Sequence, residues 1–223
     1  MEGTRGFEVL FKEVNVPHIL EKIFFSLDYD SFIESQKVNR SWKQLLSSEK
    51  YQRESQEMLN EKKKIEEKLF NFSVKGNDQE VRNCLLTGIN PNYVRVNYLR
   101  GHENIVTPLL MAAKNGHKYV VRLLLDGGAD PNKATGYGDT PLHWAAKNGQ
   151  EDVVQLLLDR GADHNKANER GKTPLHWAAI NGHTVVLQLL LDRGADRDLT
   201  NNEGKTPLQM AGNDAVVNLL KRQ

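Results

Sequence analysis

A unit of about 33 residues recurs through the second half of the chain, and this period constrains the fold more than any other feature. The tripeptide Thr-Pro-Leu recurs at a constant spacing and starts at Thr107, Thr140, Thr173 and Thr206. An aliphatic block and then Gly-Ala-Asp complete three of these units. A fixed period of about 20–50 residues is the signature of repeat architectures, in which each unit packs only against its neighbours. We therefore expect the units to stack.

Each unit is predicted to form helix, turn, helix, turn. Thr140 is a natural N-cap, and Pro141 suits the first turn of a helix because its missing N–H is not needed there. Gly149 breaks this first helix. Residues Val153–Leu158 are apolar nearly all round, which predicts a second helix packed on several sides, and Gly161 ends it. One such unit cannot bury its apolar faces alone.

The pattern Thr-Pro-Leu-His-Trp-Ala-Ala, followed by Gly and by Val-Val-x-Leu-Leu-Leu-x-x-Gly-Ala-Asp, resembles the ankyrin repeat. This resemblance implies an α-solenoid with β-turn or hairpin tips that binds proteins on a concave face. The first and last units are degenerate, as expected for terminal units that face water. The five units are predicted at 66–106, 107–139, 140–172, 173–205 and 206–223.

The first 60 residues lack this period and are predicted to contain three short helices within about 35 residues. So small a segment cannot bury its own apolar surface, so we expect it to dock on the rest of the chain or to await a partner. Its pattern Ile-Leu-x-x-Ile-Phe-x-x-Leu-Asp, then Asp-x-Phe and Val-x-Arg-x-Trp, resembles the F-box.

F-box proteins bind a Skp-family adaptor, which joins them to a cullin–RING ubiquitin ligase of the SCF type, and a second domain holds the substrate. The resemblance implies adaptor binding by a set of mostly apolar residues. They are Pro17, Ile19, Leu20, Ile23, Phe24, Leu27, Phe32, Val38 and Trp42.

The predicted fold class is all-α, with a three-helix F-box at 14–50, a charged helical linker at 51–65 and the ankyrin-repeat solenoid at 66–223. The linker lies in Glu49–Lys68, where twelve of twenty residues are charged. Lys62–Lys64 could serve as a targeting signal or phosphate patch, but their acidic neighbours favour a solvated helix face.

No catalytic residue, metal site or cofactor is predicted. His143 and His176 lie one period apart, so they are repeat positions expected to hydrogen-bond the local turn. The catalytic His-Glu-x-x-His and Gly-x-Ser-x-Gly patterns and the phosphate loop do not occur. The single cysteine, Cys84, excludes an intramolecular disulfide and a Cys-rich zinc site.

The formal net charge of +1 argues against binding to nucleic acid or to an acidic membrane, each of which needs a basic face. No apolar stretch approaches the roughly 18 residues of a membrane helix, and no secretory signal is visible. We expect a monomer located in the cytoplasm, the nucleus or both.

The ankyrin resemblance places target-binding residues on the turn tips and first helices. Two units supply Tyr137, Asp139, Lys147, Asn148, Glu169, Arg170, Lys172, Ile180 and Asn181, and the last supplies Asn202, Glu203 and Lys205. Trp144 and Trp177 are expected to pack in the core rather than to stack on a ligand. Asn132 and Asn165 resemble sites that an asparaginyl hydroxylase modifies in other ankyrin proteins, although turn formation is the preferred explanation for them.

An insertion at Tyr93–Glu103 adds Tyr98 and Arg100 to the predicted target-binding set. Val94–Tyr98 alternates apolar and polar residues, which predicts a protruding hairpin. The hairpin is either a binding finger or a tolerated insertion. The enrichment of tyrosine and arginine among interface anchors favours binding.

These patterns together predict a non-enzymatic substrate-recognition subunit of an SCF-type ubiquitin ligase. One alternative is an ankyrin scaffold in which the F-box-like segment is only a cap. A second is an enzyme with catalytic groups in the groove, for which no nucleophile–base pair is visible.

Overall fold

The computed structural model describes residues 49–99 and 102–221. The nine predicted adaptor-binding residues, Pro17 to Trp42, therefore lie outside the described residues, as does Arg100. The chain divides into two compact units, one of residues 1–67 and 86–90 and the other of residues 68–85 and 91–223.

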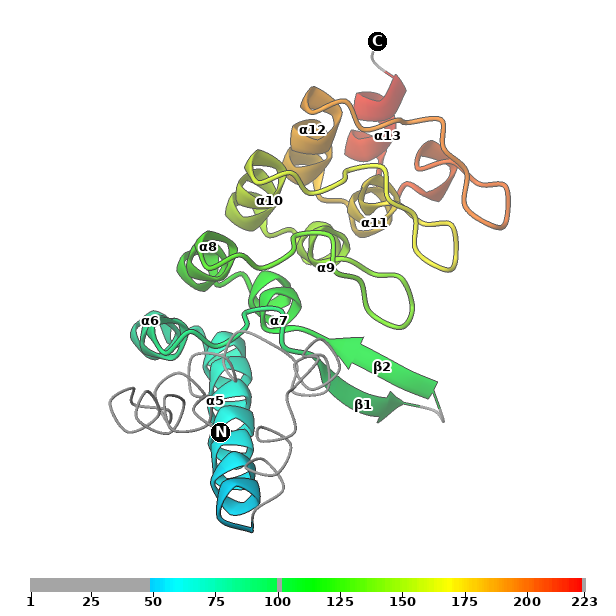
Figure 1. Cartoon of the computed structure of the whole chain (residues 1–223). Coiled ribbons are helices and arrows are strands. Elements are labelled where there is room, and N and C mark those ends of the chain that lie inside the picture. Colours follow the sequence, from blue (N-terminus) through cyan, green and yellow to red (C-terminus); the bar gives the residue numbers. More distant parts are fainter. Residues whose placement is uncertain (1–48, 100–101, 222–223) are drawn as a thin grey trace, which may run out of the picture. The chain divides into compact units, whose positions relative to one another are not determined.

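The described part of the first unit begins with a long helix, α5 (Glu49–Lys75), of which residues 68–75 belong to the second unit. The charged stretch predicted as a helical linker belongs to α5, which continues without a break through 27 residues (Figure 1). Neighbouring turns of α5 are joined by a salt bridge from Lys64 Nζ to Glu61 Oε1, 3.0 Å long. Within the described ranges, no helix is both long enough and apolar enough to cross a membrane.

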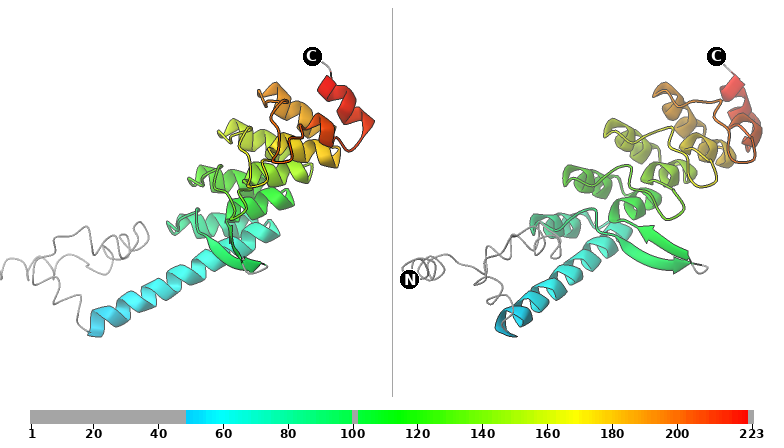
Figure 2. Two further views of the ribbon diagram at one scale, coloured as in Figure 1. Left: turned by 90° about the vertical axis from the view of Figure 1, so that its right-hand side faces the viewer. Right: turned by 45° about the vertical axis from the view of Figure 1, so that its right-hand side comes forward.

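The second unit contains a stack of short antiparallel helix pairs. The first helix of each pair lies on one side of the stack and the second on the other (Figures 1 and 2). The first helices are α7 (Pro108–Asn115), α9 (Pro141–Lys147) and α11 (Pro174–Asn181). The second helices are α8 (Lys118–Asp126), α10 (Glu151–Asp159) and α12 (Thr184–Asp192). The helix–turn–helix units predicted from the period are confirmed here.

Shorter elements flank these pairs. Before them lies α6 (Asp78–Leu86), and after them come the 3₁₀ helix η1 (Leu208–Met210) and α13 (Asp214–Lys221). The 3₁₀ helix occupies the place of a first helix, but none of its three residues is buried.

The threonine before each proline starts a first helix, as predicted. Thr107 Oγ1 accepts the N–H of Leu110 at 3.2 Å, and Thr140 Oγ1 accepts that of His143 at 3.4 Å. At the other end of α11, Gly182 adopts a left-handed backbone with φ of 75°, a conformation that residues with a side chain rarely adopt. The same local chemistry therefore produces the same helix in each repeat.

Paired alanines and an aliphatic block form the core. In the unit of α9 and α10, the fully buried residues include Leu142, Ala145, Ala146, Val154 and Leu157. Because the two alanines carry only a methyl group each, α9 can approach both α7 and α11 closely. The core is thus continuous from one repeat to the next.

The insertion forms the predicted hairpin. Its strands are β1 (Arg95–Leu99) and β2 (His102–Val106), paired antiparallel with Arg95 opposite Val106 and Leu99 opposite His102. Val106 is buried, whereas Val96 is exposed. The predicted site residue Tyr98 lies in β1. Across the described ranges this is the one sheet, and the tips of the later repeats are turns.

Leu157→Ala should lower the free energy of unfolding by about 2–5 kcal/mol, because it removes a fully buried side chain between repeats. Leu158→Ala is the matched control, since Leu158 is the next residue of α10 but only half-buried. Urea unfolding followed by circular dichroism measures both. Equal losses for the two variants would contradict the assigned core.

Candidate functional site

Three turns, called the tips here, connect each repeat to the next first helix at residues 135–139, 168–172 and 201–205. Each tip is organised by one buried side chain that accepts two backbone N–H groups. Asn168 Oδ1 accepts those of Arg170 and Lys172, both at 3.0 Å. Thr135 and Asn201 do the same in the other two tips. The tips are therefore fixed turns rather than open loops.

Adjacent tips are joined through the main chain. The N–H of Glu169 donates to the carbonyl of Tyr137, and the N–H of Asn202 donates to that of Arg170, both at 3.1 Å. These bonds occupy backbone groups and leave the side chains of Tyr137, Glu169 and Arg170 exposed. The tips thus present three predicted binding side chains on a rigid support.

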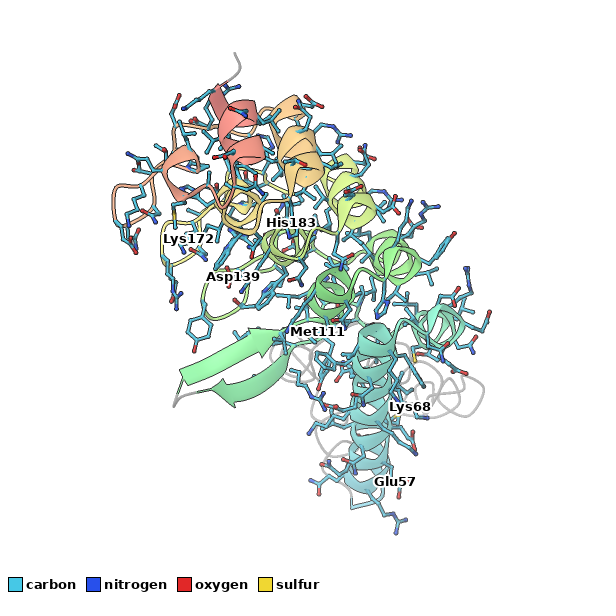
Figure 3. All side chains as sticks on the ribbon, turned by 180° about the vertical axis from the view of Figure 1, so that it is seen from behind. Glu57, Lys68, Met111, Asp139, Lys172 and His183 are labelled. Carbon is cyan, nitrogen blue, oxygen red and sulfur yellow. The ribbon has the colours of Figure 1, made fainter. Side chains whose placement is uncertain are left out.

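Asp139 was predicted to bind a target, and it also links two tips. Its Oδ1 accepts a hydrogen bond of 2.7 Å from Asn168 Nδ2 in the next tip. Asp139 is half-buried, and Figure 3 shows it with Lys172 on the side of the stack where the hairpin also lies. One carboxylate oxygen therefore serves the scaffold.

Beside the tips, lysine and tryptophan side chains alternate along the first helices. Lys114 Nζ lies 4.7 Å from the centre of the Trp144 ring, and Lys147 Nζ lies 4.9 Å from the same ring. Lys147 Nζ is also 4.5 Å from the Trp177 ring, which Lys172 Nζ approaches to 4.7 Å. We call these five residues the Lys–Trp ladder.

The Trp144 ring also packs against the core, as predicted. Trp144 contacts a buried cluster of Phe70, Val106 and Leu110, and both Trp144 and Trp177 are half-buried. The Trp144 Nε1 atom is covered by protein and has no hydrogen-bond partner. Packing and contact with lysine therefore coexist on the same ring.

The carbonyl groups of two ladder lysines, Lys114 and Lys147, are held by the following repeat. Lys114 O accepts from Asn148 Nδ2 at 2.8 Å, and Lys147 O accepts from His183 Nε2 at 3.1 Å. Asn181 Nδ2 donates within its own helix, to Trp177 O at 2.8 Å. The amides of Asn148 and Asn181, both predicted to bind a target, are thus engaged in the scaffold.

Ile180 occupies the position in α11 that lysine occupies in α7 and α9, and it is half-buried. Lys114 was not among the predicted binding residues, although its place one period before Lys147 was a visible signal. The tryptophans were predicted only as core residues. Lys172 completes the ladder from a tip, which the repeat spacing alone does not indicate.

Two family models, both of ankyrin repeats, match the chain at residues 69–168 and 157–211. The array consists of ankyrin repeats. Such repeats mediate binding between proteins, so the chain has a protein-binding role. Neither match extends to residues 14–50, and the F-box resemblance stays a prediction. A search of curated proteins finds no match to this chain.

Two histidines anchor the ankyrin tips to the first helices. His143 Nδ1 accepts the N–H of Thr140 at 3.1 Å, so its Nε2 carries the proton and donates to Lys172 O at 3.0 Å. His176 repeats this arrangement with Thr173 and Lys205, each at 3.1 Å. The predicted turn-pinning role is confirmed for both histidines.

Burial lowers the pKa of His143, against the opposing effect of the Asp139 carboxylate and the Lys172 carbonyl. Burial also lowers the pKa of His176. Protonation would in addition replace the lone pair that accepts the threonine N–H in each cap. Both rings are therefore neutral parts of the ankyrin scaffold near pH 7.

Asn132 and Asn165 bridge consecutive ankyrin repeats. Asn132 Oδ1 accepts the N–H of Asp163 at 2.8 Å, and its Nδ2 donates to Gly161 O at 3.1 Å. Asn165 Oδ1 accepts the N–H of Asp196 at 2.9 Å. These bonds agree with the preferred turn-forming explanation, and hydroxylation stays untested.

In the described part of the chain, the single cysteine and the possible metal ligands show no arrangement typical of a reactive site. Cys84 is buried, and burial raises the pKa of its thiol, which opposes formation of the reactive thiolate. Within residues 49–99 and 102–221, no cluster of three or more histidine, cysteine or acidic side chains could hold a metal ion.

The ankyrin array should lose stability as the pH falls from about 7 to 5. Because the pKa values of His143 and His176 are lower in the folded than in the unfolded state, the unfolded chain binds more protons below about pH 6.5. Each histidine contributes at most about 1.4 kcal/mol per pH unit. Urea midpoints measured across this range test the dependence.

The matched variant is His143→Gln with His176→Gln. Glutamine already makes this cap in the last unit, where Gln209 Oε1 accepts the N–H of Thr206 at 2.9 Å. The double variant should retain the fold and show a shallower pH dependence than the unmodified chain. An unchanged slope would show that other groups cause the acid sensitivity.

Proposed function

We propose that this chain is a substrate-recognition subunit of an SCF-type cullin–RING ubiquitin ligase. In this proposal the ankyrin array holds a protein target, while residues 14–50 bind a Skp-family adaptor that recruits the ligase. The observation that supports target binding by the array is the face of joined tips, whose backbones are hydrogen-bonded and whose side chains are exposed. The F-box resemblance supports the other half.

The construction of the tips favours target binding. Tyr137 and Arg170 extend from turns whose main chains are already hydrogen-bonded, so binding would order few additional groups. Preorganisation of this kind lowers the entropic cost of association. Tyrosine and arginine are also frequent anchors of protein interfaces.

We further propose that the chain is not itself a catalyst and needs no cofactor. In both His143 and His176, Nδ1 accepts in a helix cap and Nε2 donates to a tip carbonyl, so neither ring is available as a general base. The chain would act as a monomer in the cytoplasm, the nucleus or both, on proteins rather than on nucleic acid or membranes. Ubiquitin transfer would then be the work of other ligase subunits.

An ankyrin scaffold without a ubiquitin role is the second candidate, and protein-binding repeats support it equally. The two candidates differ in one measurable property, which is stoichiometric binding of a Skp-family adaptor.

Trp42→Ala and Ile23→Asp should each abolish binding of a purified Skp-family adaptor. Both positions belong to the apolar set of the F-box pattern, and truncating a buried aromatic typically costs about 3–5 kcal/mol. Size-exclusion chromatography of the mixed proteins gives the stoichiometry, and circular dichroism checks that the array remains folded. If both variants still bound the adaptor, the scaffold candidate would be favoured. It would also be favoured if the unmodified chain itself did not bind the adaptor.

Replacing Tyr137, Arg170 and Ile180 together with alanine should remove target binding while adaptor binding persists. The first two are exposed and the third is half-buried, so stability should change little. The matched control replaces Tyr119, Arg122 and Val185, which are exposed on the second helices. A reconstituted ubiquitination reaction provides the readout.

The control triple variant should ubiquitinate the target at the rate of the unmodified chain. If the tip variant did so as well, the tip face would be rejected as the target site. The β1–β2 hairpin would then become the leading candidate.

A further inference from the structure

The Lys–Trp ladder concentrates positive charge on the tip side of the array. Its ammonium groups come from two successive first helices and one tip, at Lys114, Lys147 and Lys172. No described carboxylate lies within salt-bridge distance of any of the three. The ladder therefore carries charge that the described part of the chain does not neutralise by pairing.

Two acidic side chains on the tips beside the ladder already have a hydrogen-bond or salt-bridge partner. Asp139 Oδ1 accepts from Asn168, and Glu203 Oε2 is 2.9 Å from Lys205 Nζ. The hydrogen bond and charge of Lys205, with a smaller effect of Lys172, lower the pKa of the Glu203 carboxyl. Glu169 is exposed. The Lys–Trp ladder and the tips beside it together retain an excess of positive charge, which complements an anionic partner.

Contact with the indole rings restricts where the ammonium groups can lie. Lys147 Nζ is in contact with two rings at once, and all three lysines are half-buried. A cation over an aromatic face is attracted to it, and the contact reduces the freedom that a surface lysine would lose on binding. The ladder is thus partly preorganised for an anion.

The same contacts distinguish between two kinds of anionic partner. Proteins that bind single-stranded nucleic acid stack bases on exposed aromatic faces. Here lysines lie over the rings of Trp144 and Trp177, and the Trp144 Nε1 atom is covered. A ligand therefore meets ammonium groups rather than ring faces, and carboxylates are the groups that suit them.

We propose that the Lys–Trp ladder binds an acidic, extended segment of a protein partner. This inference rests on the proposed target-holding role of the array and specifies the chemistry of the target. Packed helices lie about 8–10 Å apart, which sets the step between successive repeats. A polyproline II segment rises about 3.1 Å per residue with three residues per turn, so every third side chain lies on one face about 9 Å from the last. Carboxylates at every third residue match the ladder.

The test uses the full chain and a fluorescent peptide of repeated Glu-Pro-Ser triplets, with a Gln-Pro-Ser peptide as control. Fluorescence anisotropy should show binding of the Glu peptide that weakens with added salt, and little binding of the Gln peptide. Replacing Lys114, Lys147 and Lys172 with glutamine should weaken binding of the Glu peptide about tenfold or more.

Two matched variants control this result. The first replaces Lys118, Arg122 and Lys221 with glutamine, which removes three positive charges from α8 and α13 and should leave binding unchanged. The second replaces the three ladder lysines with arginine, which keeps the charge over the rings and should retain binding. Thermal melts followed by circular dichroism establish that each variant is folded.

Equal binding of the Glu and Gln peptides would overturn the proposal, as would equal losses in the ladder and control glutamine variants. Tighter binding of an oligothymidine than of the Glu peptide would assign the surface to nucleic acid instead. Adaptor binding is measured on the same variants. Absence of adaptor binding would reject the ligase role and leave the peptide result intact. Failure with the peptide alone would reject only the acidic-segment inference.

Discussion

The close approach of successive first helices sets the spacing on which the rest of the structure depends. Ala145 and Ala146 are fully buried, and their small side chains let α9 lie against its neighbours. At this separation Lys147 Nζ contacts both Trp144 and Trp177. The same spacing brings each tip within hydrogen-bonding distance of the next. Packing in the core thus determines the geometry of the binding face.

Much of the array could be predicted from the period alone, because its causes are local. A threonine cap, a proline in the first turn and a glycine at the end act within a few residues, so their positions define each helix. The ladder could not be predicted in full. Lys114 and Lys147 share a repeat position, but Lys172 reaches Trp177 from a tip, and Ile180 occupies the lysine position in α11. That arrangement requires knowledge of which segments meet in space.

Position in the repeat also does not show that some predicted binding residues take part in the scaffold as well. Asn148, Asn181 and Asp139 were assigned to a target because their positions belong to the tips and first helices. One polar atom of each also bonds within the scaffold, to Lys114 O, Trp177 O and the Asn168 amide, respectively. Sequence position identifies a face but does not show which polar groups the scaffold already uses.

The 3₁₀ helix η1 gives the two ends of the stack unequal strength. In a linear array, each repeat is held mainly by its neighbours, so a repeat with little buried surface frays before the interior does. None of the residues of η1 is buried, whereas α11 before it buries five. Under tension or proteolysis, residues 206–221 should therefore detach first, while the tip that carries Glu203 and Lys205 stays bonded to Arg170 and His176. A partner that binds this tip and α13 together would therefore stabilise the array where it is weakest.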